Sequence, residues 1–276
     1  MRSATPRRVT LIVGLAAALF LVLPGNLQAR QADQPDRRVE QRTYVFPETG
    51  EEIPYGVFLS SKVRSGVSAP LVVALHGLGG DQNSMIRLGR RTVDFAEDGG
   101  YILVTPMGYN SGGWYGIPTN TNSPGQGDVG DDEARVRELS EQDVLAVLDM
   151  MREEFNVDDR RTYLMGHSMG GAGTLYLGAK HSSNWAALAA IAPAARRLDP
   201  DALLRSMPGM PVMIVQGDMD TAVAVEGVRV WAEKLEELGM THEYIEIAGG
   251  DHGNVIGIGM PGIFEFFAAH SKGSSR

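Results

Sequence analysis

The stretch YLMGHSMGGAG, residues 163–173, places Ser168 among glycines directly after a short apolar run. A serine hydroxyl is a weak nucleophile unless a tight turn holds it exposed beside a base and a pair of N–H donors. Glycine at positions 166 and 170 lets a strand and the helix that follows it approach closely around a strained serine. The Gly-x-Ser-x-Gly pattern therefore predicts that Ser168 attacks a carbonyl carbon, although an ordinary glycine-rich turn can have the same letters.

The candidate base for Ser168 is His252. It lies in the loop AGGDHGN, directly after an apolar run at residues 244–247 that reads as the last strand, and an imidazole there can reach the serine. The other histidines fit this role less well. His76 precedes the serine in the chain and suits a structural hydrogen bond, His167 is expected to point away from its neighbour, and His181, His242 and His270 fall at a helix end, a strand start and the C-terminal tail.

The candidate acid lies in the loop GDMDTAV, which follows an apolar run at residues 212–216 and offers Asp218 and Asp220. We prefer Asp220, because it lies further from the strand end and can turn toward His252, whereas Asp218 suits a bond that holds the turn. Both carboxylates could instead cap the next helix. With Asp220, the order along the chain is Ser, Asp, His.

The stretch LHGLGG, residues 75–80, ends another predicted strand with a turn that can direct a backbone N–H group into the same site. We assign the N–H groups of Leu78 and Met169 as the donors that would stabilise an oxyanion. Met169 also begins a predicted helix, whose dipole favours a negative charge there.

The segment 107–138 is rich in Gly, Asn, Pro and Asp and has no hydrophobic period, which predicts a long loop. Trp114 and Tyr115 give it aromatic surface that can line an acyl or aryl pocket, or can merely pin the loop to the domain. Its acidic residues lack the spacing of a calcium loop, so we expect a solvated surface, no metal and no cofactor. These residues are Asp128, Asp131, Asp132 and Glu133.

Apolar runs that read as strands alternate with helix-period stretches along the chain. Two strands at residues 39–46 and 53–60 can form an antiparallel start; further strands are predicted at 71–75, 102–105, 162–165, 187–191, 212–216 and 244–247, and helices at 85–97, 140–154, 169–180, 223–238 and 260–270. Strict alternation predicts an α/β fold with a mostly parallel sheet and helices on both faces. Only residues 194–210 separate two strands after the serine, which leaves no room for a large cap domain.

Residues 1–29 combine three arginines with an apolar run at 9–23, which is the layout of a cleaved signal peptide or, alternatively, a retained anchor. We expect a linker at 30–38, one catalytic domain at 39–276, and a secreted or periplasmic protein without stable membrane association after cleavage. The formal net charge of −9 makes nucleic acid and anionic membranes poor partners. Because the chain has no cysteine, it has no disulfide and no thiolate nucleophile.

With these motifs in order, the chain resembles the α/β-hydrolase superfamily over nearly all of residues 39–276. The stretches LHGLGG, GWYG, GHSMGGAGTLYLGAKH and GDMDTAV are most similar to secreted carboxylesterases related to polyhydroxybutyrate depolymerases and feruloyl esterases, and to prolyl-oligopeptidase-type domains. The resemblance implies that Ser168, Asp220 and His252 form a triad, with Leu78 and Met169 as oxyanion donors. Gln216 departs from the pattern, since these families often have histidine there.

The resulting expectation is a serine esterase that acts on small-molecule or polymeric ester substrates. Neutral short-chain or aryl esters and polyesters fit best, because an acidic surface disfavours anionic substrates. Two alternatives stay open: a prolyl-oligopeptidase-like peptidase, and a non-catalytic binding protein on a hydrolase fold. The residues do not indicate an oligomeric state.

Overall fold

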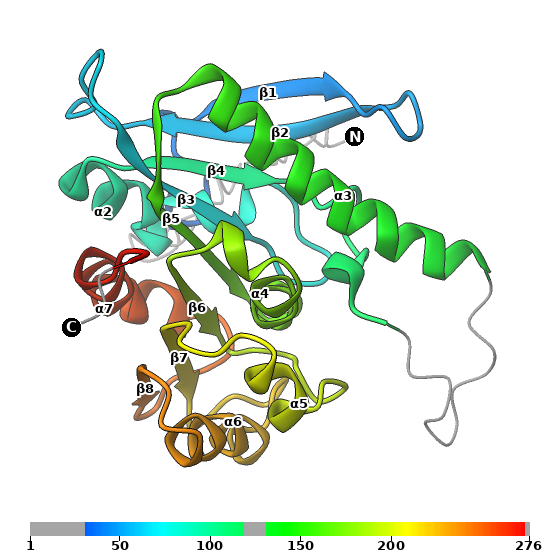
Figure 1. Cartoon of the computed structure of the whole chain (residues 1–276), viewed down its shortest axis with the longest axis vertical. Coiled ribbons are helices and arrows are strands. Elements are labelled where there is room, and N and C mark those ends of the chain that lie inside the picture. Colours follow the sequence, from blue (N-terminus) through cyan, green and yellow to red (C-terminus); the bar gives the residue numbers. More distant parts are fainter. Residues whose placement is uncertain (1–30, 119–130, 274–276) are drawn as a thin grey trace, which may run out of the picture.

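Eight strands form one sheet in the computed structural model, which describes residues 31–118 and 131–273 (Figure 1). Their order in space is β1 (Glu40–Val45), β2 (Glu52–Leu59), β4 (Ile102–Pro106), β3 (Ala69–Leu75), β5 (Val157–His167), β6 (Ala187–Ile191), β7 (Val212–Gly217) and β8 (His242–Ile247). β2 pairs antiparallel with β1 and with β4, and every other pair is parallel. The predicted mostly parallel α/β sheet with an antiparallel start is therefore confirmed.

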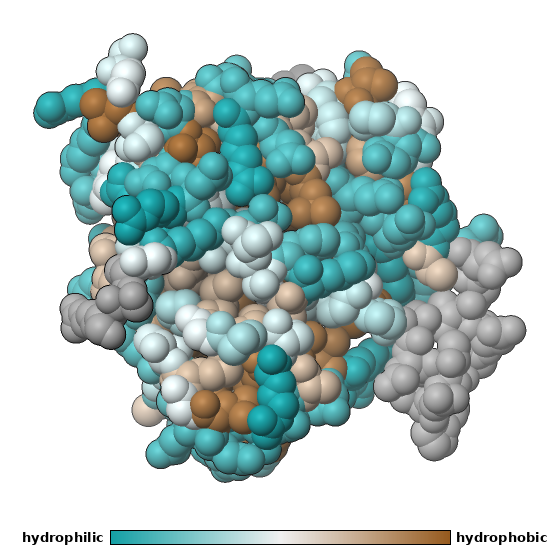
Figure 2. Space-filling view, in the orientation of Figure 1, coloured by the Kyte–Doolittle hydropathy of each residue, from teal (hydrophilic) through white to brown (hydrophobic). Residues whose placement is uncertain are grey.

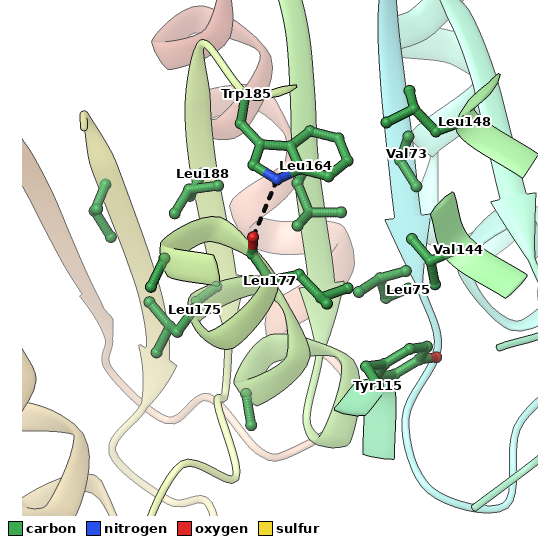
Figure 3. Packing of buried hydrophobic residues seen from close by; sticks show 14 of the residues in the cluster. Val73, Leu75, Tyr115, Val144, Leu148, Leu164, Leu175, Leu177, Trp185 and Leu188 are labelled. Carbon is green, nitrogen blue, oxygen red and sulfur yellow. Dashed lines mark hydrogen bonds between the residues drawn. The ribbon is translucent and has the colours of Figure 1, made fainter. Parts of the chain in front are cut away.

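Helices cover both faces of this sheet because its inner strands are apolar on both sides. Every residue of β3, β4, β6 and β7 is buried. Leu71 and Val73 face the core under α3 (Asp131–Glu154), α4 (Met169–Lys180), α5 (Pro200–Arg205) and α6 (Val225–Glu237), as Figure 3 shows in part. Val72 and Ala74 face α2 (Thr92–Gly99) and α7 (Val255–Ala269) on the opposite side.

The parallel strands bring four loops to one edge of the sheet. The carboxyl ends of β3, β5, β7 and β8 lead into residues 76–80, 168, 218–220 and 249–254, respectively. Ligands of open α/β sheets bind at this edge, because the loops there precede helix N-termini and can vary without disturbing the core. The fold therefore gathers the segments in which the sequence predicts a catalytic site.

One predicted helix, at 85–97, is broken in its first half. The chain instead forms two 3-10 turns, η1 (Ser84–Ile86) and η2 (Leu88–Arg90), before α2 begins at Thr92. Arg91 adopts a left-handed conformation with φ of 58°, which interrupts the helical hydrogen bonds. The N-terminal segment also constrains the chain before α2, because the Leu88 N–H donates to the carbonyl oxygen of Gln34.

Two helices differ from the sequence-based prediction in extent. α3 begins at Asp131, so the predicted loop at 107–138 is helical in its last eight residues, where Arg135 pairs with Glu138 at 2.8 Å. α5 was not predicted, although its signals are present: the Asp199 side chain accepts the Asp201 N–H at 3.0 Å, and Pro200 occupies the first turn.

The segment predicted as a signal peptide, residues 1–29, lies outside the described residues. From residue 31, the segment expected to be a linker lies against the domain: Pro35 forms a β-bridge with Arg87, and the buried Asp36 binds Arg38 at 2.6 Å. Within 31–118 and 131–273, no helix has the length and apolar character needed to cross a bilayer.

Hydrophilic side chains cover most of the face in Figure 2, where apolar areas are small and separate.

Candidate active site

Ser168 occupies a sharp turn between the end of β5 and the first residue of α4. Its backbone angles are φ 56° and ψ −113°, a strained combination for a residue with a side chain. A Cβ at Gly166 would lie 2.3 Å from the Gly170 carbonyl oxygen, and one at Gly170 would lie 2.5 Å from the Leu75 carbonyl oxygen. The glycines therefore let the strand and helix meet closely enough to hold Ser168 in this conformation.

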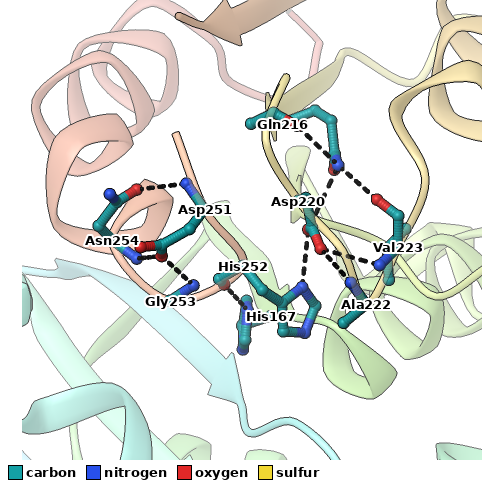
Figure 4. A network of polar contacts seen from close by, with 10 residues as sticks. His167, Gln216, Asp220, Ala222, Val223, Asp251, His252, Gly253 and Asn254 are labelled. Atoms are coloured by element: carbon teal, nitrogen blue, oxygen red, sulfur yellow. Dashed lines mark hydrogen bonds and ion pairs between the residues drawn. The ribbon is translucent and has the colours of Figure 1, made fainter. Parts of the chain in front are cut away.

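His252 and Asp220 form a hydrogen-bonded pair (Figure 4). Nδ1 of His252 lies 2.7 Å from Oδ2 of Asp220; the carboxylate is fully buried, and the imidazole is 28% exposed. Ser168 and His252 line the same cavity, and the serine hydroxyl makes no hydrogen bond within the described part of the chain. A hydrogen bond between nucleophile and base often tightens only when substrate binds. The structure thus brings Ser168 and His252 to one cavity, with Asp220 bound to the side of the imidazole that carries Nδ1.

Four N–H donors surround the Asp220 carboxylate. Its Oδ1 accepts the backbone N–H groups of Ala222 and Val223, each at 2.8 Å, while Oδ2 accepts from His252 and from Gln216 Nε2 at 3.3 Å. Burial alone would raise the pKa of Asp220, but the backbone donors and His252 outweigh burial and lower the pKa below its usual range. Asp220 is therefore an ionised carboxylate that can stabilise a positive charge on the imidazole.

Asp218 has the turn-holding position expected of it. Its Oδ1 accepts the Gly249 N–H at 2.7 Å and so ties the loop after β7 to the loop that carries His252. Gln216, where the resemblance leads us to expect histidine, is fully buried and donates to the Val223 carbonyl oxygen at 2.8 Å. Gln216 thus connects the end of β7 to the chain that supplies a donor to Asp220.

His167, which was expected to point away from Ser168, contacts His252, and the sequence-based prediction did not include this contact. Its Nε2 lies 2.7 Å from the carbonyl oxygen of His252, and the two imidazole rings are 4.6 Å apart. Burial lowers the pKa of His167 to about 3, and the neighbouring His252 adds to the decrease. A neutral His167 can donate through Nε2 and hold the loop that carries His252. In the sequence, the position of His167 directly before Ser168 was the signal that could have placed its side chain near His252.

Of the two predicted oxyanion donors, Leu78 shares the cavity with Ser168, and Met169 follows Ser168 in the chain. Leu78 is 63% exposed and lines the cavity, and Met169 is the first residue of α4. Neither backbone N–H group donates to an oxygen atom in residues 31–118 and 131–273, and the first N–H groups of a helix have no partner within it. Both groups are thus free to bind a developing negative charge.

Trp114 and Tyr115 take opposite positions, although they are neighbours in η3 (Trp114–Gly116). Trp114 lines the cavity, whereas Tyr115 is fully buried and its hydroxyl donates to the His76 carbonyl oxygen at 3.0 Å. The prediction that Tyr115 lines the pocket is therefore wrong, because the structure places Tyr115 in the core (Figure 3). His76 has the structural role expected of it, with Nε2 2.6 Å from the Met107 carbonyl oxygen.

The remaining sequence candidates lie outside this cavity. His181 follows α4 and pairs with Glu141 at 2.7 Å, His242 begins β8, and His270 follows α7. Of the acidic stretch, Asp128 is outside the described residues and Glu133 pairs with Arg137. No group of three metal-ligating side chains gathers within the described ranges.

The cavity has a volume of about 660 Å³, enough for a small organic molecule. Its lining comes from Ser168, His252, Leu78 and Trp114, from residues 193–197 and 222–224, and from α6, where Val228 and Trp231 supply apolar surface. Between β6 and β7, where residues 192–211 are all described, the chain has one short helix, α5, and no large cap domain. An acyl or aryl group can therefore lie against an apolar wall while its carbonyl carbon faces Ser168.

The chain is similar in sequence to known esterases. A sequence model of the family described as "Putative esterase" matches residues 47–255. The curated "Putative esterase NocK" of Nocardia uniformis subsp. tsuyamanensis is 28% identical over 159 residues, which cover 58% of this chain and 42% of that protein. The chain thus spans less than half of the curated relative that it matches.

Solved structures share the fold. An S-formylglutathione hydrolase from Agrobacterium tumefaciens superposes with a TM-score of 0.68 at 17% identity, covering 86% of this chain and 97% of that one. A ferulic acid esterase from Anaeromyces mucronatus gives a TM-score of 0.63 at 19% identity, covering 87% and 94%. At such identities the likeness concerns the fold, which is the α/β-hydrolase fold that the motifs predicted.

Proposed function

We propose that this chain, which belongs to the esterase family whose model matches residues 47–255, hydrolyses carboxylic esters through an acyl-enzyme on Ser168. The observation that carries the proposal is the contact of His252 with the buried Asp220 at 2.7 Å, since His252 lines the same cavity as the strained Ser168. A base fixed by a carboxylate beside a serine in a tight turn is the arrangement that activates a hydroxyl.

In the first half of the proposed reaction, Ser168 Oγ attacks the ester carbonyl carbon and His252 Nε2 takes the hydroxyl proton. Asp220 stabilises the resulting imidazolium, and the N–H groups of Leu78 and Met169 bind the oxyanion. The C–O bond to the alcohol then breaks, and the alcohol leaves with the proton from His252. The acyl group remains on Ser168.

In the second half, water takes the place of the alcohol. His252 removes a proton from the water as it attacks the acyl carbon, and the tetrahedral intermediate collapses to release a carboxylic acid. The proton returns to Ser168 Oγ, so the enzyme regains its initial state. The net reaction is ester plus water to acid plus alcohol.

The proposed substrates are short-chain or aryl esters, or polyesters. Support comes from the apolar walls of the cavity, from Trp114 at its edge, and from the absence of a large cap between β6 and β7 among the described residues. A cavity without a large cap admits a polymer chain end as well as a small ester. Such an enzyme does not need a lipid–water interface to displace a cap before substrate binds.

The test compares Ser168→Ala with Ser183→Ala, an exposed serine outside the cavity that serves as the matched control. On p-nitrophenyl esters of rising chain length, Ser168→Ala should lower kcat about 1,000-fold or more, because the acyl-enzyme cannot form. A fluorophosphonate should label the wild-type protein and Ser183→Ala but not Ser168→Ala. A folded Ser168→Ala protein with wild-type turnover would overturn the mechanism, and faster cleavage of an aminoacyl anilide than of any ester would favour a peptidase.

Export is a separate part of the proposal. It rests on the arginines and the apolar run within residues 1–29. Expression of the full chain in a bacterial host, followed by fractionation and N-terminal sequencing, should give a periplasmic or secreted protein that begins near residue 30. An uncleaved protein in the membrane fraction would indicate a retained anchor.

A further inference from the structure

The cavity that holds Ser168 and His252 carries two guanidinium groups and no carboxylate on its lining. Arg196 and Arg197 line it, and neither Asp nor Glu does so in the part of the chain that the structure describes. The chain as a whole has a formal net charge of −9. The local charge that a substrate meets is therefore opposite in sign to the charge of the whole protein.

Among the described residues, Arg196 and Arg197 also differ from most other arginines in lacking an acidic partner. No ion pair joins either one to a carboxylate within the described ranges. Elsewhere arginines pair with acidic side chains, as do Arg38, Arg42, Arg152, Arg205 and Arg229. Asp220, the carboxylate that binds the cavity-lining His252, is buried and already bound by four N–H donors.

Trp114 contacts one of the two guanidinium groups. The guanidinium carbon of Arg197 lies 5.7 Å from the centroid of the Trp114 ring. A guanidinium that stacks on an aromatic face keeps its N–H donors, which lie in its plane, available to an anion. Arg196, which adjoins Arg197 and is exposed, adds a second cation at the same edge.

From this geometry we propose that the cavity selects esters that carry a carboxylate, on the acyl or the alcohol part, and that Arg196 and Arg197 bind it. The proposal rests on the ester-hydrolase function proposed above. The planar guanidinium matches a carboxylate in two parallel hydrogen bonds, and such charge-assisted bonds are about twice as strong as neutral ones. The apolar walls hold the carbon chain between the carboxylate and the scissile carbonyl group. The expectation of neutral substrates, which used the net charge of the chain, is thereby replaced by one that uses the charge of the site.

The kinetic test uses two pairs of esters that differ chiefly in charge. Mono-p-nitrophenyl glutarate and p-nitrophenyl pentanoate share a leaving group and a similar acyl length; 4-carboxyphenyl acetate and phenyl acetate place the carboxylate on the alcohol part. In at least one pair, wild-type kcat/KM should be about tenfold or more higher for the charged ester, the gain expected from one charge-assisted contact. The ratio should fall when NaCl is raised to 1 M, because salt screens the attraction.

The variants separate charge from packing. The double variant Arg196→Gln with Arg197→Gln should bring the ratio of kcat/KM close to one, and the double lysine variant should retain a large part of it because the charges remain. Arg205→Gln is the matched control, since Arg205 lies on α5, pairs with Asp201 and does not line the cavity. It should leave the ratio at the wild-type value. A wild-type ratio of one or less in both pairs, or an undiminished ratio in the double glutamine variant, would overturn the proposal.

A binding measurement keeps this proposal distinct from the proposed hydrolysis. Calorimetry on Ser168→Ala with each of the four esters measures affinity without turnover. Tighter binding of a charged ester than of its neutral counterpart supports charge selection, provided that the difference is lost in the triple variant Ser168→Ala, Arg196→Gln and Arg197→Gln. This result would support charge selection even if the wild-type protein hydrolyses nothing, and then only the proposed hydrolysis would fail. Turnover of neutral esters together with equal affinities for charged and neutral esters would refute charge selection and leave the hydrolase function intact.

Discussion

The imidazole of His252 meets Asp220 through a single short hydrogen bond, Nδ1 to Oδ2 at 2.7 Å, from a carboxylate that is itself fixed. The other carboxylate oxygen accepts the N–H groups of Ala222 and Val223, so Asp220 has little freedom to rotate. A carboxylate in this place keeps a proton on Nδ1 of neutral His252 and leaves the lone pair on Nε2 directed to the cavity. The tautomer needed for a base thus follows from the position of Asp220.

The first prediction concerns this tautomer. Asp220→Asn replaces an acceptor with an amide that can donate to Nδ1, which favours the tautomer that lacks a lone pair on Nε2. We expect kcat on a p-nitrophenyl ester to fall by about 10³- to 10⁴-fold, with the circular dichroism spectrum unchanged. Asp218→Asn is the matched control and should retain most activity, because Asp218 binds only the Gly249 N–H. Loss of activity in Asp218→Asn alone would transfer the role of acid to Asp218.

The second prediction concerns the glycines around Ser168. A Cβ at Gly170 would lie 2.5 Å and 2.6 Å from the backbone carbonyl oxygens of Leu75 and His76, neither of which can rotate away. Gly170→Ala should therefore lower the free energy of unfolding by about 3 kcal/mol, as overpacking does. Gly227→Ala, in α6, meets no atom within 4 Å and should be neutral or stabilising. Urea unfolding of both variants measures this, and equal midpoints would mean that the turn has room to relax.

Much of the fold could be predicted because the buried parallel strands are continuous apolar runs between glycine-rich loops. β3 and β7 are such runs, and the loops after them had to meet at one edge of the sheet. The same reasoning brings Ser168, Asp220 and His252 together. α5 could have been predicted from Asp199 and Pro200, but six residues are too few to give a hydrophobic period.

Other features depend on tertiary contacts that no local pattern records. The break before α2 reflects packing of the N-terminal segment on residues 87–89, more than fifty positions along the chain. Trp114 and Tyr115 are adjacent aromatic residues, each with a positive φ, so their sequence could not say which one faces the core. The unpaired state of Arg197 likewise depends on which acidic residues the fold brings near, and the net charge gives no information on that.

The third prediction concerns pH and His167, whose folded-state pKa of about 3 lies below the value near 6.5 of an unfolded histidine. Between these values the unfolded chain binds the proton and the folded chain does not, so this residue makes the protein less stable as pH falls below about 6.5. His167→Gln keeps a donor for the His252 carbonyl oxygen but does not titrate. Between pH 7 and pH 5, the free energy of unfolding of the wild-type protein should fall by about 2 kcal/mol relative to that of the variant, as measured by urea unfolding. A difference that stays constant over this range would show that His167 is protonated in the folded protein.

The last prediction separates the two neighbouring aromatic residues by what each contacts. Tyr115→Phe removes the hydroxyl that donates to the buried His76 carbonyl oxygen, and leaving that acceptor unpaired should cost about 1–3 kcal/mol of unfolding free energy. Because Tyr115 does not line the cavity, KM and the preference among ester chain lengths should stay at their wild-type values. Trp114→Ala removes part of the cavity edge and the ring that contacts Arg197, so it should raise KM and alter chain-length preference more than it lowers the melting temperature. Melting curves and kcat/KM over a series of p-nitrophenyl esters distinguish the two effects. If Trp114→Ala lowered the melting temperature by several degrees and left the substrate profile unchanged, Trp114 would only anchor its segment to the domain.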